Sequence, residues 1–247
     1  MVTALKPHEK KVSFPVIVGV SHASEKTAEE IARIKTILEY RFARGAKTVG
    51  LELPENYERL GIDESVPGYF HKVADIAKGM GFRVVPLEKA DLYEESWPLG
   101  VAKAYIRGGG IDLGALDGDE AGYRRALAEA EDDLRAAGKA GFYTPPELGE
   151  EACRKRVAYD KRWLGYYAKA RELIGRAGGS AEEIMREWKG MQEKRDKALI
   201  EAVRQGKPDI TIVGGAHARA LKAATGMQCI ELARFKAEDG RQASGGD

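Results

Sequence analysis

The sequence of 247 residues predicts an α/β fold with a mainly parallel sheet, helices on both faces and a helical insertion in the middle of the chain. Near both ends, short apolar segments alternate with segments of helical periodicity, the pattern of strand–helix–strand units. Between about 91 and 205 the helical pattern continues with almost no strand character. We expect one α/β domain at 1–235 with that insertion, followed by a disordered polar tail at 236–247.

Five segments have the length and apolar content of strands, and glycine, proline or polar residues bound them. Pro15 near the start of the first segment suits an edge strand or a first-residue position. Because helical segments separate the five, the strands are expected to run parallel. The expected strands are residues 13–18, 47–53, 82–88, 209–215 and 227–235.

Helical segments connect the expected strands. After the first strand, Ser24 is a candidate N-cap, apolar residues recur at helical spacing as far as Phe42, and Gly45 ends the pattern. Two further helices outside the insertion are expected at residues 68–79 and 218–226.

Within the insertion the sequence predicts long, highly charged helices. One begins at about Asp119, and the next follows a Pro–Pro pair and continues to Gly178. The last begins at Ser180, which has the capping-box spacing to Glu183, and ends at Gly206. The charges on these helices are expected to form a solvated face.

The composition excludes several classes of protein. Lys and Arg total 40 and Asp and Glu total 39, so the formal net charge of +1 gives no reason to expect nucleic acid or membrane partners. No signal-peptide pattern and no apolar run of about 20 residues is found. Cys153 and Cys229 lie far apart, without a C-x-x-C context, which predicts reduced thiols in a cytoplasmic protein.

Four ionisable residues fall at or just beyond the ends of expected strands. They are His22, Glu52, Glu88 and His217, each from a different strand. The carboxyl ends of parallel strands meet at one edge of a sheet, where ligands of α/β proteins bind. We therefore expect these four side chains to project toward one edge.

Two imidazoles with one or two carboxylates match the ligand preferences of zinc, manganese, iron and cobalt. Without a metal, a histidine and a carboxylate can act as general base and acid. Three glycines beside the histidines allow close approach of a substrate to the backbone, and helix starts there can hold an anion. These glycines are Gly19, Gly214 and Gly215.

Structural roles are the alternatives for the same residues. Each histidine can cap the helix that follows it. Glu52, between two leucines, can form a buried ion pair with an arginine, since an unpaired carboxylate is costly to bury. Glu88 can lie at an exposed strand end.

The motifs around these residues resemble the TraB/Tiki superfamily, which includes ChaN-like and erythromycin-esterase-like proteins. "GVSH" matches the first family motif at Gly19 and His22, "LEL" the family glutamate at Glu52, and "VGGAH" the late motif at Gly214 and His217. The resemblance spans residues from Val16 to about Glu231 but rests on short motifs. It implies an α/β/α core with a helical insert.

The resemblance also implies a fourth site residue. "MQEKRDKALIEAV" is similar to the family helix that carries an arginine next to Asp or Asn, which suggests Arg195. After the third strand the chain has "LEKAD" where the family often has an Asp-Arg-Asp run, so the roles of Glu88 and Asp91 are open. Activities in the family include metal-dependent peptide cleavage and ester hydrolysis.

The leading hypothesis is a hydrolase, metal-dependent, that acts on a small-molecule or peptide substrate through His22, Glu52 and His217. The histidines would be metal ligands, and Glu52 would be a ligand or the base that deprotonates a bound water. Arg195 would bind a substrate carboxylate or stabilise an oxyanion. A non-catalytic protein that binds an anionic ligand, a metal or haem is the main alternative, and a metal-free esterase-like site is the third. The substrate, the metal and the oligomeric state are left open.

Overall fold

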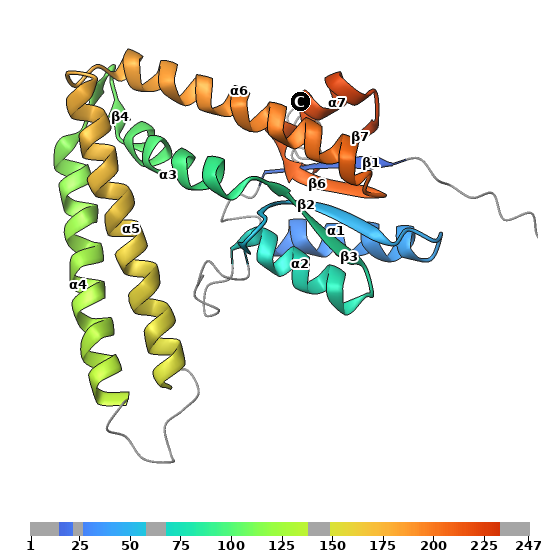
Figure 1. Cartoon of the computed structure of the whole chain (residues 1–247), viewed down its shortest axis with the longest axis horizontal. Coiled ribbons are helices and arrows are strands. Elements are labelled where there is room, and N and C mark those ends of the chain that lie inside the picture. Colours follow the sequence, from blue (N-terminus) through green and yellow to red (C-terminus); the bar gives the residue numbers. More distant parts are fainter. Residues whose placement is uncertain (1–14, 22–26, 58–67, 138–148, 233–247) are drawn as a thin grey trace, which may run out of the picture. The chain divides into compact units, whose positions relative to one another are not determined.

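The computed structural model describes residues 15–21, 27–57, 68–137 and 149–232. It confirms the α/β fold class, with a five-stranded parallel sheet and a central helical segment (Figure 1). The chain divides into two compact units. The first takes its described residues from Met1–Glu52, Tyr69–Leu87 and Leu199–Asp247, and the second from Leu53–Gly68 and Glu88–Ala198. The expectation of one domain bearing an insertion stays a prediction, and the tail at 236–247 lies outside the described residues.

The strand order of the sheet is β3-β2-β6-β1-β7. Strand β1 pairs in parallel with both β6 and β7, and β2 pairs in parallel with β6, so the first and the penultimate strands of the chain are neighbours. All five strands were expected from the sequence, with ends that differ by a few residues. Their bounds are β1 Val16–Val20, β2 Thr48–Pro54, β3 Arg83–Glu88, β6 Ile210–Gly214 and β7 Gln228–Glu231.

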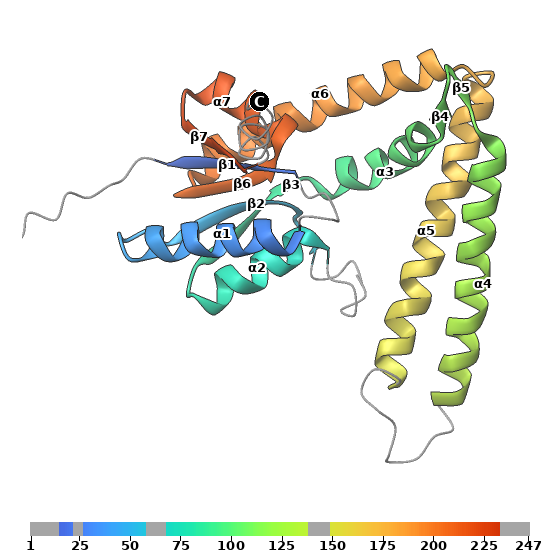
Figure 2. The ribbon, with the colours of Figure 1, turned by 180° about the vertical axis from the view of Figure 1, so that it is seen from behind.

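Helices cover both faces of the sheet in the first unit, as Figures 1 and 2 show from opposite sides. Helices α1 (Thr27–Phe42) and α2 (Tyr69–Gly79) lie on one face. Helix α7 (Gly215–Thr225) and the last two turns of α6 lie on the other. One apolar cluster joins the second face to its helices, because Ile17 and Val213 of the strands pack with Leu199 of α6. Burial of these side chains on both faces explains the continuous apolar runs of β1 and β6.

The second unit is mainly helical. Helices α4 and α5 lie side by side in both views, and α3 packs against α5 (Figures 1 and 2). Their shared core is rich in aromatic residues, including Tyr166 and Tyr167 of α5, with Trp97 and Trp163 packed against it. The boundary between the units falls inside α6, after Ala198. The bounds are α3 Ala90–Ala104, α4 Leu113–Ala137, α5 Glu150–Arg176 and α6 Ala181–Gly206.

Two details of this unit differ from the sequence-based expectation. Helix α4 begins at Leu113, not at about Asp119, because the Asp112 carboxylate accepts the N–H of Ala115 at 2.9 Å and caps the helix. A short antiparallel hairpin, β4 (Ile106–Arg107) with β5 (Gly110–Ile111), interrupts the helices. Its two turn glycines have φ of 56° and 86°, the region that a tight hairpin turn requires.

None of the helices in the described parts of the chain has the length and apolar character needed to cross a membrane.

Candidate functional site

Glu52 and His217 meet in the first unit. Glu52 lies in β2, and His217 lies in the first turn of α7, which directly follows β6, the neighbour of β2 in the sheet. The Nε2 atom of His217 is 3.4 Å from Oε1 of Glu52, and the two side chains are 7 % and 8 % exposed. The parallel arrangement of β2 and β6 therefore brings together two of the four residues expected at this edge.

The second oxygen of Glu52 has a defined partner. The backbone N–H of Gly214 donates to Glu52 Oε2 at 2.6 Å. Gly214 is the N-cap residue of α7 and makes no side-chain cap of its own. Because the start of a helix favours a negative charge, this contact is favourable and ties the Glu52 side chain to the helix start. An anion was expected at this helix start, and here the carboxylate of Glu52 itself takes the N–H of Gly214.

Gly19, the glycine of the "GVSH" motif, makes room for α7. A Cβ atom on Gly19 would be 2.9 Å from the Cβ of Ala218 and 3.6 Å from the Cα of Gly215. Real side chains essentially never approach so closely, so only glycine lets the first turn of α7 lie against β1 in this position. Gly19 thus permits the close approach of the helix that carries His217. Gly215 begins α7, where its own Cβ would be 3.6 Å from the carbonyl oxygen of Val20.

The separation of the Glu52 and His217 side chains fits metal ligands. It exceeds the usual length of an N–H···O hydrogen bond, about 2.7–3.2 Å. Two ligand atoms that each lie about 2.1 Å from a tetrahedral ion are roughly 3.4 Å apart, which is the distance found here. Among the residues that the structure describes, no group of three His, Cys, Asp or Glu residues could hold a metal ion. His22, the expected third ligand, lies outside the described residues.

Glu88 and Arg195 form a buried pair within the second unit. The Nε of Arg195 donates to Glu88 Oε1 at 2.7 Å, and its Nη2 donates to the same oxygen. The Arg195 and Glu88 side chains are 12 % and 3 % exposed. Tyr93 lies beside the pair, and burial, the largest cause, raises the pKa of Tyr93 to about 12.

The Glu88–Arg195 pair bears on the structural roles that were considered for Glu52 and Glu88. A buried ion pair with an arginine was considered for Glu52, and one is found at Glu88, so the exposed strand end considered for Glu88 is wrong. The predicted roles of Arg195 in binding a substrate and of Glu88 in the site stay predictions, and both side chains already have a strong mutual contact.

Sequence analysis missed Glu30 of α1. Its side chain is buried, at 6 % exposure, and Oε2 accepts the backbone N–H and the hydroxyl of Ser21, both at 2.9 Å. Burial and the Glu30 carboxylate raise the pKa of the Tyr69 hydroxyl. The signal was present, because Glu30 shares the buried face of α1 with Ile34 and Leu38 at i, i+4 and i+8 spacing. Glu30 thereby fixes the chain just beyond β1.

The fold and this site define an α/β protein with a buried glutamate–histidine pair at the carboxyl ends of its strands. No family model and no curated protein matches the sequence. A solved structure that matches is a mutant of the erythromycin esterase EreC in its open conformation, with a TM-score of 0.30 and 11 % identity over 83 % of this chain. The match covers 61 % of the esterase chain, less than two thirds of its length. Similarity at this level identifies neither a shared site nor a shared activity.

Proposed function

We propose that the protein is a hydrolase of the TraB/Tiki-like type, metal-dependent, that cleaves a peptide or ester bond. The observation that carries the proposal is the buried contact between Glu52 Oε1 and His217 Nε2. A carboxylate at 8 % exposure is costly to bury unless it is paired.

His217 and Glu52 would hold the ion together with His22, whose part is inferred from the sequence. A bound zinc, manganese, cobalt or iron ion would polarise the scissile carbonyl and lower the pKa of a bound water. The chain's own contribution is to hold the two ligand side chains still. Gly214 fixes one oxygen of Glu52, and Gly19 permits the close approach of the helix that carries His217. Such support keeps ligands in a productive geometry.

A metal-free site is the second candidate, and the hydrogen bond from Gly214 favours it. With Oε2 held by that N–H, Oε1 is left to orient the imidazole of His217 as a general base. A third candidate is a protein that binds a small anionic ligand, a metal or haem in the same place without turnover. The three candidate functions use the same residues and differ in whether a metal is needed and whether a substrate is turned over.

Metal analysis of the purified protein, followed by titration of the metal-stripped protein with Zn²⁺ or Mn²⁺, separates the first candidate from the second. The same preparations are then assayed on a panel of simple esters, peptides and phosphoesters, with and without added ions. The proposal expects turnover that the ion restores and that His217→Gln abolishes. Turnover of equal rate in stripped protein supports the metal-free site. Metal binding without any turnover contradicts hydrolysis and supports a binding protein.

A further inference from the structure

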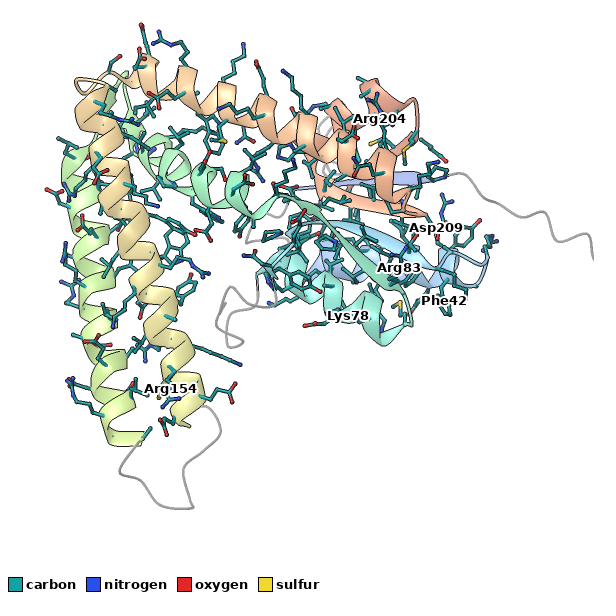
Figure 3. All side chains as sticks on the ribbon, in the orientation of Figure 1. Phe42, Lys78, Arg83, Arg154, Arg204 and Asp209 are labelled. Atoms are coloured by element: carbon teal, nitrogen blue, oxygen red, sulfur yellow. The ribbon has the colours of Figure 1, made fainter. Side chains whose placement is uncertain are left out.

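The edge of the sheet opposite the Glu52–His217 pair is rich in basic residues. In the first unit every helix that returns along the sheet ends at this edge, where the next strand begins. Figure 3 labels Arg83 at this end of the sheet, with Arg204 of α6 and Lys78 of α2 on its opposite faces. We call this set the basic edge, and it comprises Arg41, Arg44, Lys47, Lys78, Arg83, Arg204, Lys207 and Lys222.

Half of the basic edge has an ordinary structural reason. The last turns of α1, α2, α6 and α7 each hold one basic residue, which balances the partial negative charge of a helix C-terminus. That reason does not extend to the basic residues of the connecting turns or to Arg83, the first residue of β3. Arg44, Lys47, Arg83 and Lys207 lie outside the helices, and all four are exposed. The edge therefore carries more positive charge than its helix ends require.

Three members of the basic edge differ from several exposed basic residues elsewhere, because they lack an ion pair within the described parts of the chain. Arg33, Arg154 and Lys161 are examples of exposed basic side chains that pair with nearby carboxylates. By contrast, within the described parts of the chain no carboxylate forms an ion pair with Arg83 or Lys207, nor with Lys222.

An acid that does lie at this edge is already engaged. Asp209 Oδ2 accepts the backbone N–H groups of Lys47 and Thr48, at 2.8 and 2.9 Å, and the hydroxyl of Thr48. These neutral donors leave its charge in place, so Asp209 offsets one of the positive charges around it and the edge keeps a surplus of basic residues.

We propose that the basic edge docks on the phosphate backbone of a nucleic acid duplex, without reading its sequence. Contacts from Lys and Arg to phosphates supply most of the affinity in binding of this kind. This departs from the expectation drawn from the net charge of +1, because that total hides a local surplus. The proposal is independent of any activity at Glu52 and His217.

The same residues argue against other anionic partners. Protein interfaces are centred on buried aromatic and apolar anchors, and surface-bound membrane proteins commonly insert apolar side chains. Here the ring of Phe42 packs edge-on against Phe82, with centroids 5.2 Å apart. Single strands need a row of exposed rings on which bases can stack. One face of the exposed Tyr40 ring is covered by the guanidinium of Arg44, 3.5 Å from its centroid.

The test is fluorescence anisotropy of a labelled DNA duplex of about 20 base pairs, titrated with the full chain over a series of salt concentrations. The edge variant replaces Arg83, Lys207 and Lys222 by Gln. The matched control replaces Arg135, Arg154 and Arg186 by Gln, which changes the net charge equally on exposed helical positions of the second unit (Figure 3 labels Arg154).

We expect the parent to bind and the edge variant to bind at least about tenfold more weakly, with a salt slope lower by about three, one per lost phosphate contact. The control is expected to bind like the parent. Absence of binding by the parent at low salt overturns the proposal, as does an equal loss in both variants. Tighter binding of the parent to phosphatidylserine vesicles, to polyglutamate or to a single strand than to the duplex also overturns it.

Discussion

Glu52 and Gly214, 162 positions apart in the sequence, are joined by a hydrogen bond of 2.6 Å from the backbone N–H to Oε2. This bond gives Glu52 a structural role whatever its chemistry, because it ties β2 to the start of α7. Any test of the site must therefore separate the loss of this anchor from the loss of the charge that faces His217.

Gly19→Ala is expected to destabilise the protein and to move His217. The added methyl group would meet the Cβ of Ala218 at 2.9 Å, in a region where Ala218 is fully buried. Overpacking of this kind costs about 1–3 kcal/mol. The free energy of unfolding from urea titration measures the cost, and metal affinity reports the position of His217.

A second variant shows whether the clash with Ala218 causes the effects of Gly19→Ala. Gly19→Ala combined with Ala218→Gly removes the clash, so metal affinity should recover even though glycine in a helix costs about 1 kcal/mol. As a control, a methyl group on Gly190 meets nothing within 4 Å, so Gly190→Ala should not destabilise. Equal metal affinity in Gly19→Ala and the parent would contradict the positioning role of this glycine.

The Glu88–Arg195 pair should show strong coupling in a double-mutant cycle. Removal of one partner leaves the other charge buried and unpaired, at a cost of about 3–5 kcal/mol, whereas replacement of both partners by apolar residues costs less. Glu88→Leu, Arg195→Met and the double variant are compared by urea unfolding. Single losses that simply add up in the double variant would show that the pair contributes little.

The tyrosines of the second unit should make the protein sensitive to alkali. Burial raises the pKa of Tyr93 from its ordinary value of 10.0 to about 12, and it raises the pKa of four further tyrosines. In each case the folded state holds the proton more tightly than the unfolded state, so this stability is complete below pH 10 and falls as pH rises from about 10 to 12 and beyond. The four are Tyr105, Tyr123, Tyr166 and Tyr167.

Absorbance at alkaline pH measures phenolate formation, and circular dichroism measures the fold in the same samples. Most of the phenolate signal of these buried tyrosines should arise together with unfolding. Tyr93→Phe should make the fall in stability between pH 10 and 12 shallower. Full ionisation of the buried tyrosines near pH 10 with the fold intact would contradict their burial.

The sequence predicted the elements that rest on periodicity. Apolar runs with glycine and proline boundaries marked β1, β2 and β6, and the rule that parallel strands end at one edge predicted that Glu52 and His217 would meet. The sequence could not predict which carboxylate pairs with Arg195. Which carboxylate Arg195 reaches depends on the position of α6, and spacing in the sequence does not contain that position.

The start of α4, the Gly108–Gly109 turn and the buried Glu30 were not recognised from the local sequence. The helix was expected from about Asp119, but the cap at Asp112 starts α4 at Leu113. The Gly108–Gly109 turn was hidden within a long helical stretch. Glu30 was overlooked because a glutamate near a helix start is ordinarily assigned to the solvent, although its spacing to Ile34 places it on the buried face.

The most direct test of the account is thermal unfolding of Glu52→Gln with and without a divalent metal, together with the metal content of the purified protein. Glutamine keeps an oxygen that can accept the N–H of Gly214 and removes the charge that faces His217. The account predicts a melting temperature close to that of the parent in metal-free buffer and a loss of the stabilisation that metal gives the parent. A sharply lowered melting temperature in metal-free buffer, in a protein whose parent shows no response to metal, would contradict a metal-dependent site and leave Glu52 as a structural residue that anchors α7.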